Sequence, residues 1–206
     1  SPVPGNQAPR GRLGIPRTVN IYENYPLWVT LFTALGFSVE LSSPSSNDLF
    51  FRSYETIPSQ TVCYPAKLAH GHILDLIERK TGNIFFPCLP NERQEFSTQS
   101  GTYNCPVVVG YPELLAKNIG ALQKNGINLI HDFLPLDREA LAKRLHVLPF
   151  FADILITELE MAVEAGFNEQ DRFKEDMRMA GERTLAALEK SGGGRRHCSC
   201  RASLPY

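Results

Sequence analysis

The sequence lacks the features that mark several large classes of protein. It has no apolar run near the ~20 residues of a membrane span, and no charged segment followed by an apolar one near its start, so neither insertion nor secretion is indicated. The formal net charge is −1, and the body of the chain contains no basic block. We therefore expect a cytoplasmic protein that has neither nucleic acid nor a membrane as its main partner.

Familiar catalytic and nucleotide-binding motifs are missing as well. There is no GxGxxG after the first predicted strand, no Walker loop, no GxSxG and no HExxH. Nucleotide binding, serine hydrolysis and zinc proteolysis thus have no support. The five cysteines do not form CxxC pairs, so their spacing alone names no metal.

The 206 residues suffice for one substantial core and a small helical unit. We predict a linker over residues 1–12, where proline, glycine and arginine occur without periodicity. An α/β domain that carries cysteines follows over residues 13–150, and C-terminal helices over 151–191. The tail, residues 192–206, has no apolar period and is predicted to be disordered.

Strand and helix signals alternate along the predicted domain. Strands are expected at residues 13–15, 37–41, 83–86, 107–109 and 127–133, and helices at 21–35, 47–54, 65–79, 111–123 and 138–145. This order predicts an α/β fold with a parallel sheet, a flavodoxin/Rossmann-like three-layer domain. Helices over residues 150–165, ending at Gly166, and over 169–190 form its helical C-terminal extension.

Cys63 lies at the start of a predicted helix. Pro65 suits the first turn of that helix because it has no amide hydrogen to leave unpaired, and Lys67 adds positive charge to the same turn. A thiolate beside such an N-terminus is stabilised by the helix dipole and by unpaired amides, and is suited to bind metal.

Cys88 and Cys105 also have prolines close by. Ligands of parallel sheets bind beyond the carboxyl ends of the strands, and this rule places Cys88 on the same side as Cys63. Cys105 is expected at the start of the strand over residues 107–109, with the polar loop of residues 89–104 returning it to the others. Two interpretations stay open, a shared metal or cluster site and a set of buried structural thiols.

Two histidines and one glutamate are further candidates. His70 and His72 are two residues apart on the same predicted helix, so at most one of them can face Cys63, and a Cys3His zinc site is one alternative. Glu23 lies in the segment after the first strand and is a candidate site residue. The other interpretation of Glu23 is a solvated charge at a helix start.

Several motifs together resemble one known family. They are Gly14-Ile-Pro-Arg, Asn20-Ile-Tyr-Glu-Asn-Tyr-Pro26, residues 59–67, His70-Gly-His72, Phe86-Pro-Cys-Leu-Pro90 and Tyr103-Asn-Cys-Pro106. As a set, over residues 13–194, they resemble the uncharacterised domain of long activase-type proteins related to the 2-hydroxyglutaryl-CoA dehydratase system. In that system an ATPase activator passes an electron to a dehydratase whose subunits hold [4Fe-4S] clusters on cysteines. This chain is similar to the dehydratase-subunit side.

The resemblance implies that Cys63, Cys88 and Cys105 are ligands of one [4Fe-4S] cluster, which leaves one iron open to another ligand. It implies as partner an ATPase activator domain or a dehydratase-like subunit, within a lyase-type or ATP-dependent electron-transfer system. The chain is then incomplete as an enzyme alone, and it has no ATPase domain. The alternative is a structural or partner-docking α/β domain with no cluster or with a structural zinc.

The end of the chain departs from this resemblance. After Ser191-Gly-Gly-Gly194 relatives continue with a strand similar to Ile-Val-Leu-Ala-Gly-Arg-Pro-Tyr-His, whereas this chain continues Arg-Arg-His-Cys-Ser-Cys. Codons can be chosen for the tail that encode the relatives' strand in a shifted frame. We therefore predict a frameshifted, truncated reading frame, in which Cys198 and Cys200 are accidental.

Overall fold

The computed structural model describes residues 8–94 and 101–190. It divides into two compact units, Ser1–Gln170 and Asp171–Tyr206. The first unit contains a four-stranded sheet in the order β2-β1-β3-β4, and every pair of neighbouring strands in it is parallel. The strands are β1 (Arg12–Ile15), β2 (Ser38–Leu41), β3 (Asn83–Phe85) and β4 (Asn128–Ile130).

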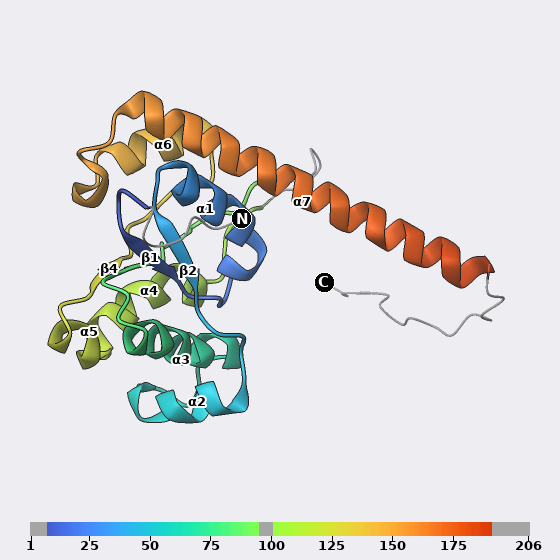
Figure 1. The fold of residues 1–206 in the computed structure, drawn as a ribbon. Helices are drawn as coiled ribbons and strands as arrows, with labels where there is room; N and C mark the ends of the chain where they lie inside the picture. Colours follow the sequence, from blue (N-terminus) through green and yellow to red (C-terminus); the bar gives the residue numbers. More distant parts are fainter. Residues whose placement is uncertain (1–7, 95–100, 191–206) are drawn as a thin grey trace. The chain divides into compact units, whose positions relative to one another are not determined.

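Helices cover both faces of this sheet. They are α1 (Ile21–Ala34), α2 (Asn47–Ser53), α3 (Tyr64–Glu78), α4 (Pro106–Asn118), α5 (Gly120–Lys124), α6 (Arg138–His146) and α7 (Ile156–Lys190), with 3-10 turns η2 (Tyr54–Thr56) and η3 (Pro149–Phe151). Within the first unit, α1, α6 and the start of α7 lie on one side, and α3, α4 and α5 on the other (Figure 1). The predicted α/β three-layer fold is confirmed, and the strand order is that of flavodoxin-like sheets.

Aromatic side chains fix α1 on its face of the sheet. The ring of Phe32 lies 4.6 Å from that of Phe85 on β3 and 5.8 Å from that of Phe151 in η3, centroid to centroid. Trp28 approaches Phe85 at 4.9 Å. All four side chains are fully buried. Rings of this size bury large apolar areas, so they anchor α1, the helix that follows β1, to the sheet.

Gly166 does not end a helix, as the sequence suggested, because α7 continues from Ile156 to Lys190. The glycine lies instead where α7 crosses α1. A Cβ atom there would lie 2.8 Å from the carbonyl oxygen of Leu27, so only glycine allows this approach. One turn later Gln170 donates from Nε2 to the carbonyl of Glu23 (2.7 Å) and accepts from the amide of Leu27 (3.2 Å).

The strand predicted over residues 107–109 is also wrong, because these residues form the first turns of α4. Three successive valines favour a strand, but Pro106 in the first turn favours a helix start. Tyr111 and Leu115, four residues apart, then bury one helical face in the core. The helix predicted over residues 111–123 is interrupted at Ile119, whose backbone is not helical, and so belongs to α4 and α5.

In the second unit, the described residues belong to α7 and are mostly exposed, Met177 and Leu185 among them. No helix within residues 8–94 or 101–190 is both long and apolar enough to span a bilayer. The predicted tail, with Cys198 and Cys200, lies outside the described residues.

Candidate functional site

Cys63 and Cys105 occupy equivalent places at the starts of two helices. Cys63 is the N-cap of α3, and its carbonyl accepts from the amide of Lys67 (3.1 Å). Cys105 is the N-cap of α4, and its carbonyl accepts from the amide of Val109 (3.1 Å). The helix start predicted for Cys63 is therefore confirmed, whereas Cys105 begins a helix and not a strand. Both thiols are free and exposed.

Cys88 lies just beyond the carboxyl end of β3, in the segment that follows the strand. Its amide donates to the carbonyl of Asp132 (3.0 Å), and its carbonyl accepts from the amide of Leu134 (3.0 Å). Burial is the main cause that raises the pKa of this thiol to about 11. A hydrogen bond with the backbone of Glu113 lowers the pKa, and the negative charges of Glu113 and Asp132 raise it further. In the metal-free protein Cys88 is thus a neutral, buried thiol.

Helix α4 is directly connected to two of the three cysteines, and one of its residues is affected by the charge of the third. Cys105 begins it, and Cys88 hydrogen-bonds to the backbone of Glu113 within it. The pKa of Tyr111, also on α4, is raised to about 12 by burial and by the negative charge of Cys63. Even so, within residues 8–94 and 101–190 no three histidine, cysteine or acidic side chains gather into a group that could hold a metal ion.

A shallow apolar cleft lies between the segment that leads into α3 and the first turns of α4. Its volume is about 380 Å³. The residues that line it adjoin Cys63 on one side and Cys105 on the other: Pro58, Ser59, Val62, Pro106, Val107, Gly110, Tyr111 and Leu114. Two of the lining residues have side-chain hydroxyls, the exposed Ser59 and the buried Tyr111.

His70 forms the buried end of a hydrogen-bond chain from this cleft. The hydroxyl of Thr56 donates to the carbonyl of Ser53 (2.7 Å), so at its 2.8 Å contact with His70 it accepts a hydrogen bond from Nδ1–H. Nε2 of the neutral ring must then accept from the hydroxyl of Tyr111 (3.1 Å). Burial lowers the pKa of His70 to about 4. Both ring nitrogens are therefore in use, and His70 is not a free metal ligand.

His72 is satisfied in the same way on the other side of α3. Its Nδ1 lies 2.8 Å from the hydroxyl of Ser42 and its Nε2 3.0 Å from that of Ser45. Its pKa is lowered to about 4, chiefly by burial; the charge of Asp75 raises it and that of Arg17 lowers it. Neither histidine is grouped with cysteines, so the described residues give no support to a Cys3His zinc site.

Sequence reasoning missed a carboxylate that holds the long loop in place. Glu92 accepts from the side-chain amides of Asn24 (3.0 Å) and Asn104 (2.9 Å), and more weakly from that of Asn20 (3.3 Å). Asn104 also donates to the carbonyl of Leu89 (2.9 Å). The loop that precedes Cys105 is therefore tied to the start of α1 by hydrogen bonds, without need of a metal. Nothing in the spacing of these residues reveals the network.

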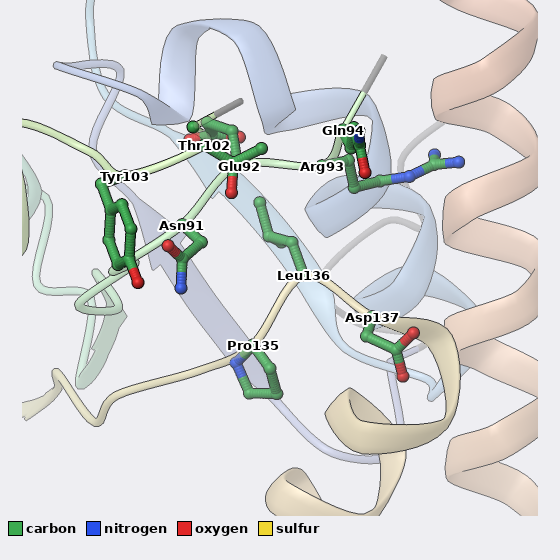
Figure 2. A pocket seen from close by; sticks show the side chains of 10 residues that line it. Asn91, Glu92, Arg93, Gln94, Thr102, Tyr103, Pro135, Leu136 and Asp137 are labelled. Atoms are coloured by element: carbon green, nitrogen blue, oxygen red, sulfur yellow. The ribbon is translucent and has the colours of Figure 1, made fainter. Parts of the chain in front are cut away.

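Glu92 also borders a polar pocket of about 670 Å³ (Figure 2). Residues 91–94 and 101–103 form one side of it, and residues 135–137, which lead into α6, lie across from them (Figure 2). The oxygens of Glu92 already accept three amides, so the carboxylate serves to order this loop. The sequence candidate Glu23 has an exposed side chain, and Asn24 beside it makes the contact to Glu92.

A smaller pocket lies beyond the carboxyl ends of β1 and β2. Its volume is about 210 Å³, and it is lined by Arg17, Ile21, Tyr22, Tyr25 and Leu41. Nε of Arg17 is buried and has no hydrogen-bond partner.

The comparison with known protein families agrees with the motifs. The sequence matches the family described as "CoA enzyme activase uncharacterised domain (DUF2229)" over residues 12–200. Searches of curated proteins and of solved structures returned no match. The family match spans almost the whole chain, including the three body cysteines and both histidines of α3. The chain therefore belongs to the CoA enzyme activase uncharacterised domain family.

Proposed function

We propose that this chain is an iron–sulfur domain of a 2-hydroxyacyl-CoA dehydratase/activase-related redox protein, with Cys63, Cys88 and Cys105 as ligands of one [4Fe-4S] cluster. It is incomplete as an enzyme alone and works with an ATPase activator domain or a dehydratase-like subunit. The cluster, when bound, supplies one-electron chemistry. The proposal rests on the family and on the donor set, since the three cysteines are free of disulfides and cysteine thiolates are the ligands of such clusters.

The observation that supports the proposal most is that Cys105 begins α4 and Cys88 hydrogen-bonds to its backbone, while Cys63 acts electrostatically on Tyr111 of the same helix. Cys63 and Cys105 are each the N-cap residue of a helix, at the end of the helix where backbone amides are unpaired. Cys88 is buried and receives a hydrogen bond from the backbone of α4. Hydrogen bonds and exposure of this kind tune the potential of a cluster held by thiolates.

The chain's own residues would also keep the thiol side of the domain in order. Lys67 donates to the carbonyl of Gln60 (2.7 Å) and so closes the loop that precedes Cys63. Thr18 donates to the carbonyl of Pro65 (3.2 Å), which ties the first turn of α3 to the segment after β1. The start of α3 is thereby held at the carboxyl edge of the sheet, the side on which Cys88 lies.

A second candidate function is a structural or partner-docking domain with no cluster or with one zinc. It is favoured by a specific observation: in the described part of the chain the cysteines are not gathered with a third ligand into a metal-binding group. A docking role needs no such group. The two candidates differ in the metal that the purified protein carries.

The test is metal and sulfide analysis of the full chain, purified and reconstituted without oxygen, together with its visible spectrum. The proposal expects about four irons and about four sulfides per chain. Cys63→Ser, Cys88→Ser and Cys105→Ser should each lose most of the iron, while the matched double variant of the tail, Cys198→Ser with Cys200→Ser, should keep it.

Circular dichroism of each variant separates loss of metal from loss of fold. One zinc per chain, or no metal at all, would overturn the cluster and favour the second candidate. Iron that survives in all three single variants would also overturn the assignment of the ligands. Loss of iron in the tail variant would show that Cys198 and Cys200 take part in binding the cluster. It would contradict the prediction that these two cysteines are accidental.

A further inference from the structure

Arg17 has a positive charge that no carboxylate in the described residues neutralises. Arg17 follows β1 and lines the pocket of about 210 Å³ at the carboxyl edge of the sheet. Within residues 8–94 and 101–190 it forms no ion pair with a carboxylate, and its Nε is buried without a hydrogen-bond partner. A buried donor left unpaired costs free energy, so such a group in a native protein calls for a physical explanation, and a bound partner is one.

The backbone of Arg17 is held firmly, so its position is not accidental. Its amide donates to the hydroxyl of Ser42 (2.8 Å), and that hydroxyl also lies 2.8 Å from Nδ1 of His72. Ser42 and His72 are both buried. The next turn includes Val19, which adopts a positive φ of 43° although it is not glycine. Backbone conformations of this kind cluster at functional sites.

The charges around the pocket point to a ligand with one negative charge. His72 is neutral at neutral pH, and both of its ring nitrogens are occupied by serine hydroxyls. The other lining residues are two aliphatic residues, Ile21 and Leu41, and two tyrosines, Tyr22 and Tyr25. Arg17 is thus the single cation of the pocket, which suits a carboxylate better than a phosphate with two charges.

The walls of the pocket suit an apolar body behind that charge. Besides Arg17, two tyrosines and two aliphatic residues line the pocket. A cavity of ~150 Å³ is enough for benzene in a protein core, so a pocket of about 210 Å³ has room for one ring and a carboxylate. Pockets that bind small molecules combine such apolar walls with a few polar groups that orient the ligand.

We propose that this pocket binds a small monocarboxylate with a flat, apolar body, and that Arg17 pairs with its carboxylate through the guanidinium fork. The fork geometry matches the two oxygens of a carboxylate. The site contains none of the cysteines, so it does not depend on a cluster. Its place beyond the carboxyl ends of β1 and β2 is on the carboxyl edge of the sheet, the edge at which parallel α/β sheets bind ligands, beside the switch point between β1 and β3.

The test uses three probes on the full chain: benzoate, its neutral isostere benzamide, and inorganic phosphate. Binding is followed by the rise in melting temperature with ligand concentration and by ligand-observed NMR. Benzoate should bind saturably, and benzamide and phosphate about tenfold more weakly or not at all. Arg17→Met should weaken benzoate binding by about 10-fold to 100-fold, the loss expected for a charged hydrogen bond.

Arg52→Met is the matched control, because Arg52 is exposed and already paired with Asp48 (3.0 Å) and Glu78 (2.8 Å). It should leave benzoate binding unchanged. The free Arg17→Met protein should be no less stable than the wild type, since it loses an unpaired charge. If it fails to fold, Arg17→Lys serves instead, since it keeps the charge without the fork and should bind benzoate more weakly than the wild type does.

Equal binding of benzoate and benzamide would overturn the proposal, as would preference for phosphate or no binding of benzoate. Unchanged affinity in the arginine variants would show that Arg17 is not the partner of the carboxylate. Destabilised free protein with unchanged affinity would assign Arg17 a structural role. None of these outcomes depends on iron content, so this proposal and the cluster assignment fail separately.

Discussion

Replacing Gly71 with alanine should destabilise the protein although alanine is the better helix former. Gly71 lies in the middle of α3, between the two buried histidines, and faces α2. A Cβ atom there would lie 2.4 Å from the backbone carbonyl oxygen of Leu49 and 2.3 Å from its Cδ2. Non-bonded carbon–oxygen contacts are normally ~3.3 Å or more, so α2 must move by about 1 Å.

Two opposing effects, helix propensity and overpacking, decide whether Gly71→Ala raises or lowers the stability of the protein. Alanine favours the helix over glycine by ~1 kcal/mol. Overpacking of a core costs ~1–3 kcal/mol. The upper end applies here because the added Cβ atom meets backbone, which cannot rotate away as a side chain can. That backbone also belongs to the start of α2, which is held by the hydrogen bond from the amide of Leu49 to the hydroxyl of Ser46 (3.1 Å). The net loss should be about 2 kcal/mol, a fall in melting temperature of roughly 4–8 °C for a chain of this size.

Gly110→Ala on α4 is the matched control, because a Cβ atom there meets nothing within 4 Å. It should raise the melting temperature by roughly 2–4 °C, through helix propensity alone. Urea unfolding and thermal scans of both variants measure the difference. The reasoning is refuted if Gly71→Ala is as stable as the wild type, or if the two variants shift in the same direction.

Three further predictions concern buried polar groups. Gln170→Leu should lose ~1–3 kcal/mol of unfolding free energy in urea, because it strips two hydrogen bonds from the backbone of α1. Tyr111→Phe should lose a similar amount because it leaves Nε2 of His70 without a donor, whereas Tyr103→Phe, at an exposed ring, should change stability by less than ~0.5 kcal/mol.

The third follows from His70 and His72, whose folded pKa of about 4 lies below the ordinary 6.5. The unfolded chain therefore binds more protons in this range. Stability should be full above pH 6.5 and fall toward pH 4, by up to ~1.4 kcal/mol per pH unit for each histidine, and a flat urea profile would contradict this.

The fold was predictable from the sequence where local signals agreed with one another. Apolar strands ending at proline or polar turns, followed by helical periods ending at glycine, predicted the parallel sheet and its layers. Where a local signal met a distant partner, the sequence misled. Glycine is typical of helix ends, but Gly166 is required within α7 because the carbonyl of Leu27, far away in the chain, leaves no room for a Cβ atom. The valines after Cys105 favour a strand until Pro106 and the buried face of α4 are considered together.

The candidate site was predictable only in part, for a similar reason. Pro65 marked the helix start at Cys63 because the signal is confined to one turn. The contacts of Glu92 join two asparagines at the start of α1 with Asn104, far away in the chain, and no spacing rule links them. Glu23 is charged and follows a strand end, which makes it a candidate from the sequence. The contact that orders the loop comes from the side-chain amide of Asn24, the next residue.

Helix α3 positions both proposed sites, and this explains why so many of its residues are buried. Its first residue follows Cys63, and its first turn is tied by Pro65 to Thr18, in the segment that also contains Arg17. Two turns later His72 fixes Ser42, which in turn holds the amide of Arg17. A shift of α3 along its axis would move the Cys63 thiol and the support of Arg17 together. The close approach at Gly71 restricts such a shift, because the helix surface there already touches the backbone of α2. A single glycine can therefore set the position of both sites without taking part in either.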